Sequence, residues 1–350
     1  MYVSQVIIGD VIEVGLEAEL DLSVVCPFYN EEQIIEGSIL ALVEQLRQIG
    51  ASWELIVVDD GSCDASSEYA RKLASEYPNV RYLGYRFNRG RGHALRTGIE
   101  QARGSIIVTT EIDLSWGDDI INRLYREACE HPDTEIIVAS PHLPNGAYKN
   151  VPLRRVLYSQ IGNRVIRTCM MNAVTMNTGM TRAYRRKPIR ALPLEEDGKE
   201  FHLEVILKAR GFNYSIREIP AILEWKVHKH QGGKVVRKSS SKINKLIVSH
   251  SLFSLFANPI RYVWGLGGAA AAFSLGFLLV GVVRYTMELV SVYSLIVSLA
   301  FAILSLILFG FGVIAQQGNM VQRELWRMRR DMWEQSQGAA EERIDYGYEI

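Results

Sequence analysis

The sequence predicts an α/β protein with a mostly parallel sheet, followed by two helices that cross a membrane. Three apolar runs rich in β-branched residues each end at a polar or acidic turn, which is typical of strands buried on both faces of a parallel sheet. Nearer the C-terminus, two stretches without charge each exceed the roughly 20 residues that span a bilayer. Because open parallel sheets bind ligands at the carboxyl ends of their strands, the turns after the three runs form the candidate site.

The elements of the sheet domain follow from the alternation of apolar runs with helical periodicity. The predicted strands are 22–26, 55–58, 80–83, 105–109 and 135–139. The predicted helices are 32–49, a segment capped by Asp64 and stopped by Pro78, 93–102, 118–129 and, beyond the last strand, 152–170 with a basic face. Strands that alternate with helices predict a doubly wound parallel sheet.

The two charge-free stretches, about 262–283 and 289–315, predict a transmembrane hairpin. Two buried helices of a soluble protein are the alternative, which fits such long stretches poorly. Basic residues precede the first span and follow the second. The positive-inside rule therefore places the α/β domain and both termini in the cytoplasm, in a two-span protein of the cell membrane or an equivalent internal membrane. The predicted organisation is a segment of unknown role (1–20), the α/β domain (21–225), a basic amphipathic interfacial region (226–261), the two helices (262–316) and a cytoplasmic tail (317–350).

Composition narrows the classes of partner. Thirty-nine lysines and arginines balance 39 aspartates and glutamates, so net charge indicates no nucleic-acid partner. Four scattered cysteines without a paired spacing predict reduced thiols, and no signal peptide is visible at the N-terminus. The basic region is expected to hold a helix at 242–256 that lies in the membrane interface, the alternative being a helix packed on the soluble domain.

Acidic residues after two of the predicted strands suggest ligand chemistry. Glu111 and Asp113 offer hard oxygen ligands that suit a divalent cation bridging to a diphosphate, although an acidic turn can also be a solvated loop. Asp60 is expected to contact a base or ribose, whereas Ser62 and Asp64 are expected to cap the next helix. The glycine-rich segment 88–92 lacks the spacing of a dinucleotide fingerprint but offers backbone donors to an anion.

Taken in order, these motifs resemble a known family. The set 27–32 (PFYNEE), 59–62 (DDGS), 88–92 (NRGRG) and 111–115 (EIDLS) is similar to the family 2 glycosyltransferases, whose fold is GT-A. A second set of motifs resembles the dolichyl-phosphate mannose synthase-like branch of this family. It comprises Arg154 and Arg155 with Ser159, then 178–179, 182–186 and 198–221. The resemblance covers about 22–315.

The resemblance implies a role for each matching residue. The nucleotide-sugar group comprises Pro27, Tyr29, Glu31, Asp60, Glu111 and Asp113. The metal group, for Mg²⁺ or Mn²⁺, comprises Glu111, Asp113 and Ser115. The acceptor-phosphate group comprises Arg154, Arg155 and Ser159. Asp113 and Arg155 are the expected catalytic residues, and arginine suits its task because its planar fork bonds phosphate oxygens bidentately.

Three positions depart from the family pattern. Glu111 replaces the first metal aspartate and is one methylene longer. Pro141 stands where many relatives carry an arginine, so His142 or Lys149 is expected to supply the missing phosphate contact. Asn177 replaces an aspartate that serves as a base in some relatives. That last loss costs little if the acceptor is a phosphate, because a phosphate monoester is largely ionised near neutrality.

The implied activity is an inverting, metal-dependent transfer of a hexose, with mannose from GDP-mannose favoured, to the phosphate of a polyprenyl or dolichyl phosphate, as used in protein glycosylation. One alternative is a UDP-sugar donor such as UDP-glucose, or a growing glycan as acceptor. The other is a catalytically inactive membrane adaptor that binds nucleotide sugar. Leu325 stands where the QxxRW signature of processive synthases needs arginine, which argues against that group.

Overall fold

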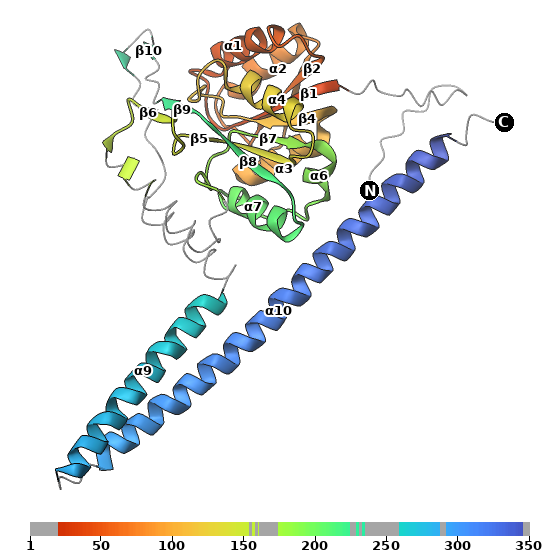
Figure 1. Ribbon diagram of the computed structural model, residues 1–350. Helices are drawn as coiled ribbons and strands as arrows, with labels where there is room; N and C mark the ends of the chain where they lie inside the picture. Colours follow the sequence, from red (N-terminus) through yellow and green to blue (C-terminus); the bar gives the residue numbers. More distant parts are fainter. Residues whose placement is uncertain are drawn as a thin grey trace.

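The computed structural model describes residues 20–153, 156–157, 160, 174–224, 229–230, 233–234, 259–287 and 292–345. Figure 1 shows an α/β domain beside two long helices, one of which runs past the domain toward the C-terminus.

The domain is built on a seven-stranded sheet of order β3-β2-β1-β4-β7-β5-β8. Its strands are β1 Leu20–Phe28, β2 Trp53–Asp59, β3 Val80–Gly84, β4 Gly104–Thr109, β5 Ile136–Ser140, β7 Arg182–Arg185 and β8 Ile216–Pro220. Every strand of this sheet is parallel to the others except β7, which pairs antiparallel with both β4 and β5. The mostly parallel sheet is therefore confirmed, and the antiparallel β7 is an addition that the apolar runs did not predict.

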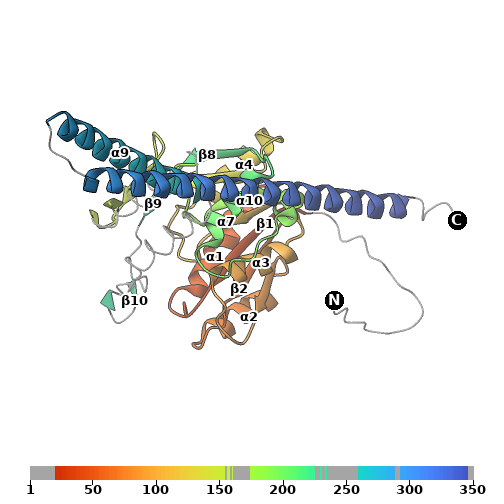
Figure 2. The same ribbon diagram turned by 90° about the horizontal axis from the view of Figure 1, so that it is seen from below.

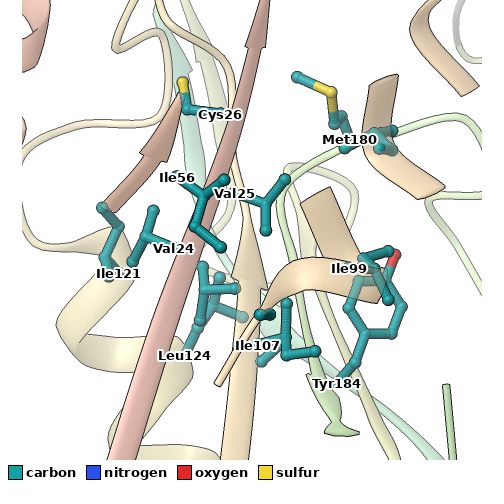
Figure 3. Packing of buried hydrophobic residues seen from close by; sticks show 14 of the residues in the cluster. Val24, Val25, Cys26, Ile56, Ile99, Ile107, Ile121, Leu124, Met180 and Tyr184 are labelled. Carbon is teal, nitrogen blue, oxygen red and sulfur yellow. The ribbon is translucent and has the colours of Figure 1, made fainter. Parts of the chain in front are cut away.

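Helices cover both faces of this sheet. They are α1 Ile35–Arg47, α2 Ser66–Glu76, α3 Arg91–Gln101, α4 Ile120–Glu130, α6 Arg186–Ala191 and α7 Phe201–Gly211. Helix α1 contacts α2 and α4, whereas α3 contacts α6 and lies on β1 and β2. In Figure 3 the side chain of Ile121 lies to one side of β1 and that of Ile99 to the other. Residues Val24 and Val25 of β1 are fully buried because each packs beneath a helix layer.

A small parallel pair of strands lies against the sheet's loops. Strand β6 Ala147–Lys149 pairs with β9 Ile222–Glu224. The amide of Glu224 donates to the carbonyl oxygen of Ser115 at 2.7 Å, which fixes this pair beside the turn that follows β4. A second short pair joins β10 Lys229–His230 to β11 Gly233–Lys234.

The C-terminal helices are α9 Pro259–Thr286 and α10 Val292–Asp345, and they pack on one another (Figures 1 and 2). By length and composition, Tyr262–Thr286 and Val292–Gly318 are sufficient to cross a membrane, and only 17% of their most apolar windows is buried. Core helices of a soluble protein would be mostly buried, so this exposure favours the hairpin predicted from the sequence.

The segment that follows the second membrane-length stretch is also helical. Helix α10 continues without a break to Asp345, so most of the segment expected as a tail at 317–350 is helical. Most of the expected helix at 152–170 and all of the expected interfacial helix at 242–256 lie outside the described residues.

Candidate functional site

Three turns meet at one edge of the sheet. Phe28 at the end of β1 is in register with Asp59 at the end of β2, and the amide of Asp60 donates to the Phe28 carbonyl oxygen at 2.9 Å. On the other side of β1, the amide of Thr110 donates to the Val25 carbonyl oxygen at 3.1 Å. The turns after β1, β2 and β4 therefore adjoin, as expected for the carboxyl ends of parallel strands.

Hydrogen bonds join the turns after β1 and β2. Asn30, at φ +53°, donates its amide to Ser62 Oγ at 3.0 Å and accepts the amide of Cys63 on Oδ1 at 2.8 Å. The amide of Glu31 donates to Ser66 Oγ at 2.8 Å. Pro27 is buried, whereas Tyr29 is 43% exposed at the rim. Pro27, Tyr29, Glu31 and Asp60, four of the six residues expected to hold the nucleotide sugar, therefore lie on adjoining turns.

The two residues expected to cap α2 behave differently. Asp64 accepts the amide of Ser66, the first residue of α2, on Oδ1 at 3.0 Å and so satisfies one donor of the first turn. Ser62 instead accepts the amide of Asn30, so its expected capping role is wrong. The hydroxyl joins two loops because the register of β1 with β2 brings them together.

The carboxylate of Asp60 is enclosed by donors from the segment that follows β3. Oδ1 accepts the Tyr85 hydroxyl at 2.6 Å and the amide of Arg89 at 2.9 Å. Oδ2 accepts Asn88 Nδ2 at 2.9 Å, and the amide of Gly90 lies 3.0 and 3.1 Å from the two oxygens. Burial and the charge of Asp60 raise the pKa of Tyr85, so this phenol remains a donor. Asp60 therefore anchors the 85–90 segment at the edge of the site.

The acidic pair after β4 has a different environment. Glu111 accepts Trp116 Nε1 at 3.2 Å, and its carboxylate lies 3.6 Å from Arg91. Its side chain is 26% exposed. Burial and the negative charge of Asp113 nevertheless raise the pKa of Glu111 to about 7. The surroundings thus leave negative charge at this turn incompletely compensated.

The geometry of this turn suits a divalent cation. Leu114, between Asp113 and Ser115, adopts φ +54°, a conformation that is uncommon for a bulky residue and that concentrates at functional sites. The amide of Ser115 donates to Asp113 Oδ1 at 3.1 Å, which orients that carboxylate. Closely spaced carboxylates with excess negative charge fit Mg²⁺ or Mn²⁺, so Glu111, Asp113 and the Ser115 hydroxyl are the residues that could hold such an ion.

Buried Cys26 lies beneath the acidic pair. Burial raises the pKa of its thiol well above the usual value, and the charges of Asp113 and Glu111 raise it further. Cys26 therefore stays protonated, which agrees with the structural thiol expected from the sequence.

Two cationic side chains that the sequence analysis did not identify flank the acidic turn. Arg91, in the first turn of α3, faces Glu111. Burial and the charge of Arg91 lower the pKa of the Lys199 ammonium, whereas the charge of Glu111 acts in the opposite direction. Arg91, Lys199 and Glu111 therefore lie within electrostatic reach of one another, although Lys199 is far from the other two in the chain. The only sequence signal was the position of Arg91 inside the glycine-rich segment.

The glycine-rich segment has a structural role that differs from the expected anion site. The amides of Gly92 and His93 both donate to the carbonyl oxygen of Asp197, at 2.7 and 3.2 Å, and so are not free to bind an anion. A side chain at Gly90, which has φ +106°, would collide with the same carbonyl. The Asp197 carboxylate in turn pairs with Arg96 and lies 3.2 Å from His93 Nδ1. The glycines thus let the loop that carries Lys199 pack on α3.

The structure describes only some of the residues expected near the acceptor. Arg154, Arg155 and Ser159 lie outside the described residues. Asn177 is buried. Its side-chain Nδ2 donates to the Val174 carbonyl oxygen at 3.1 Å, and its backbone carbonyl oxygen accepts Arg182 Nη2 at 2.7 Å. Asn177 therefore holds a loop in place.

Neither residue expected to replace the missing arginine is set up as a cation for phosphate. Lys149 pairs with Glu224 at 3.4 Å. Burial lowers the pKa of His142, which favours the neutral imidazole, and its Nε2 lies 3.1 Å from the Tyr148 hydroxyl. The expected compensation for Pro141 is therefore not supported by these contacts.

Several known proteins are similar to this chain in sequence. An undecaprenyl-phosphate 4-deoxy-4-formamido-L-arabinose transferase from Pectobacterium carotovorum is 34% identical over 174 residues, which is 49% of this chain and 51% of that relative. The chain thus spans about half the length of this relative. A transferase of the same name from Shewanella sediminis is 27% identical and matches 73% of each chain. A dolichol-phosphate mannosyltransferase from Pyrococcus furiosus is 24% identical over 68% of this chain and 73% of its own length.

The fold also has counterparts among solved structures. Glucosyl-3-phosphoglycerate synthase from Mycobacterium tuberculosis, in complex with Mn²⁺ and UDP-glucose, superposes with a TM-score of 0.50 at 19% identity, over 68% of this chain and 79% of that chain. At this identity the likeness shows the fold alone, and it agrees with the GT-A arrangement expected from the motifs. Residues 23–192 match the description "Glycosyl transferase family 2", and this chain therefore contains a domain of that glycosyltransferase family.

Proposed function

We propose that this protein transfers a sugar from a nucleotide diphosphate-sugar to the phosphate of a polyprenyl lipid at a membrane surface. The observation that carries the proposal is the acidic turn of Glu111 and Asp113, flanked by Arg91 and Lys199, at the carboxyl edge of a GT-A sheet. The same chain carries two helices long enough to cross a membrane, which suits an acceptor that cannot leave the bilayer.

The donor would lie along the edge formed by the three turns. Pro27, Tyr29, Glu31 and Asp60 would contact the base and ribose, and Asp60 would also hold the adjoining 85–90 segment in position. Glu111 and Asp113, with Ser115, would hold Mg²⁺ or Mn²⁺, which supplies positive charge for the diphosphate. Arg91 and Lys199 would stabilise the charge that grows on the departing nucleoside diphosphate.

The acceptor would enter from the membrane side. Arg155, with Arg154 and Ser159, would bind its phosphate, because the guanidinium fork matches phosphate oxygens. An acceptor phosphate oxygen would attack the anomeric carbon from the face opposite the leaving group. The new carbon–oxygen bond forms as the bond to the nucleoside diphosphate breaks, so the anomeric configuration inverts and an α-linked donor such as GDP-mannose gives a β linkage. No general base is needed, which is consistent with Asn177 at its position.

GDP-mannose is the donor that we favour, on the resemblance to dolichyl-phosphate mannose synthases and the Pyrococcus furiosus relative. A second candidate is a nucleotide-linked 4-deoxy-4-formamido-L-arabinose, because the more similar relatives carry that sugar in their names. With GDP-mannose as donor, we propose that the lipid product serves protein glycosylation and that the catalytic domain lies on the cytoplasmic side of the membrane.

A transfer assay in detergent tests the proposal. Polyprenyl phosphate and Mg²⁺ or Mn²⁺ are offered with labelled GDP-mannose, UDP-glucose, UDP-N-acetylglucosamine or the arabinose donor in parallel. Label entering the lipid phase from GDP-mannose alone is the expected result, and transfer from another donor would keep the reaction and replace the sugar. Nucleotide binding without transfer from any donor would overturn the activity and favour an inactive adaptor.

A further variant separates the acceptor site from the donor site. Arg155→Ala is expected to raise the KM for polyprenyl phosphate about tenfold or more while changing the KM for the donor little. Equal changes in both would argue against an acceptor role for Arg155.

A further inference from the structure

Helix α10 extends well beyond the membrane-length segment at its start. At about 1.5 Å per residue, the membrane-length part Val292–Gly318 spans about 40 Å, which already exceeds the ~30 Å hydrocarbon core of a bilayer. Residues 319–345 continue the same helix for about another 40 Å. Both views show this part of α10 running beyond the end of α9 (Figures 1 and 2). Most of the extension must therefore lie in water.

One face of α10 carries an uninterrupted heptad pattern, which we call the α10 seam. Its residues are separated alternately by three and four positions, as at the a and d positions of a coiled coil. They are Leu304, Ile307, Phe311, Ile314, Gly318, Val321, Leu325, Met328 and Met332. All the apolar side chains of the seam are exposed, and a side chain at Gly318 would meet open space.

The seam is distinct from the face that packs on α9. Ser298 bonds Ser274 of α9, and Ser305 Oγ donates to the carbonyl oxygen of Gly267 at 2.9 Å. Ser305 follows a seam position by one residue, and one residue turns the helix by about 100°. Helix α9 therefore covers a neighbouring face of α10 and leaves the seam open.

Lipid can cover only the first part of the seam. Leu325, Met328 and Met332 lie roughly 10 to 21 Å beyond Gly318 along the axis. These three side chains are 58%, 59% and 62% exposed, although α10 also contacts α7 of the catalytic domain. A row of large apolar side chains held in water on a rigid helix marks an interaction surface.

We propose that the α10 seam pairs with the same seam of a second copy of this chain, as a parallel coiled coil that begins in the membrane and ends in water. Insertion of both copies in the same bilayer makes the two helices parallel and sets their depth, so identical seam positions face one another. In that register the g position 324, a glutamate, is opposite the e position 329 of the second copy, an arginine, so the sequence matches opposite charges across the pair. Gly318 at an a position allows the close backbone approach that is typical of helix pairs in membranes.

Cysteine cross-linking tests this register directly. In full-length protein in native-like membranes, Cys63, Cys129 and Cys169 are replaced by serine, leaving buried Cys26. Met328→Cys is then compared with Arg330→Cys, which lies outside the a and d positions. Oxidation is expected to convert most of the Met328→Cys protein to a disulfide-linked dimer and to cross-link Arg330→Cys at least fivefold less. Equal cross-linking of the two variants, or none at position 328, would overturn the proposal.

A mass measurement in mild detergent provides a second readout. The wild type is expected to be a dimer or higher oligomer. Leu325→Asp is expected to shift it toward monomer with the thermal unfolding of the catalytic domain retained, whereas Arg330→Asp is expected to leave it assembled. Glu324→Arg should weaken the assembly, and Glu324→Arg with Arg329→Glu should restore it. A monomeric wild type, or an assembly indifferent to Leu325→Asp and to the charge exchange, would contradict pairing through the seam.

Discussion

Two pairs of acidic residues follow strands of the same sheet, yet their surroundings differ. The carboxylate of Asp60 receives a phenol, a side-chain amide and two backbone amides. Its neighbour Asp59 accepts the amide of Ser62 at 2.8 Å and the Tyr82 hydroxyl at 2.9 Å. Glu111 accepts one indole N–H and lies 3.6 Å from Arg91, yet burial and the negative charge of Asp113 raise its pKa to about 7.

The difference teaches how one sheet edge combines a scaffold with a reactive site. Carboxylates surrounded by donors stabilise loops, because each charged hydrogen bond is worth about 1.5 to 3 kcal/mol. A carboxylate pair whose negative charge is only partly compensated is costly in the protein alone and is suited to a cation. Acidic composition therefore does not separate the two roles, whereas the partners of each oxygen do.

The largest expected effect comes from Asp113→Asn. It should lower the rate of sugar transfer about 1,000-fold or more, because it removes a charged ligand at the diphosphate, while the protein stays folded. The measurement is kcat/KM in the lipid-transfer assay, with Asp133→Asn at an exposed position as the matched control. Retained activity in Asp113→Asn would remove this residue from the site.

The next effect concerns the flanking cations. Arg91→Ala and Lys199→Ala should each lower kcat/KM about 10- to 100-fold, since each removes positive charge near the leaving diphosphate. Arg126→Ala, at an exposed position on α4, serves as the control. An unchanged donor reaction in both variants would show that they only balance the charge of Glu111.

How far the sequence alone reaches can be judged at these same residues. The strands were predictable because burial on both faces demands a continuous apolar run, and the spans because a bilayer excludes charge. The position of Glu111 and Asp113 at the carboxyl edge of the sheet was predictable because both residues closely follow such a strand. The donors that surround Asp60 were not, because they come from a segment after β3 that only the strand order brings alongside.

Contacts between segments that are distant in the sequence explain the other differences between the structure and the expectations. Lys199 approaches Glu111 because the loop around Asp197 packs on the glycines of α3, and neither segment carries a pattern that names the other. Ser62 bonds Asn30 rather than the helix behind it for the same kind of reason. The sequence analysis assigned no secondary structure to 317–350, although the heptad spacing of its apolar residues is a sign of the helix that α10 forms there.

A stability measurement sharpens the contrast between the two acidic pairs. Asp60→Asn should lower the free energy of unfolding by about 2 to 3 kcal/mol, because buried donors lose a charged acceptor. For a domain of this size, that corresponds to a fall in Tm of about 4 to 12 °C. Asp113→Asn should leave the Tm of the metal-free protein unchanged or raise it. Thermal unfolding in EDTA measures the Tm of both variants. A larger fall in Tm for Asp113→Asn than for Asp60→Asn would contradict the contrast between the two pairs.

The smallest expected effect is a pH dependence at Glu111. Its pKa in the folded protein is raised to about 7 from 4.5, so folding favours the protonated form. In metal-free protein its contribution to stability is fully present below the ordinary pKa and is lost as the pH rises toward and through 7. Glu111→Gln, which stays neutral, should therefore raise the Tm by a few degrees at pH 8 and hardly at all at pH 5. A Gln variant that is less stable than wild type at pH 8 would contradict this assignment.

The most direct test of the contrast is Mn²⁺ binding followed by electron paramagnetic resonance in the presence of nucleoside diphosphate. Wild type and Asp60→Asn are expected to bind the ion with similar affinity, whereas the affinity of Asp113→Asn for Mn²⁺ should be at least 100-fold lower. Retained binding in Asp113→Asn, or loss confined to Asp60→Asn, would contradict the assignment of the cation to the turn after β4.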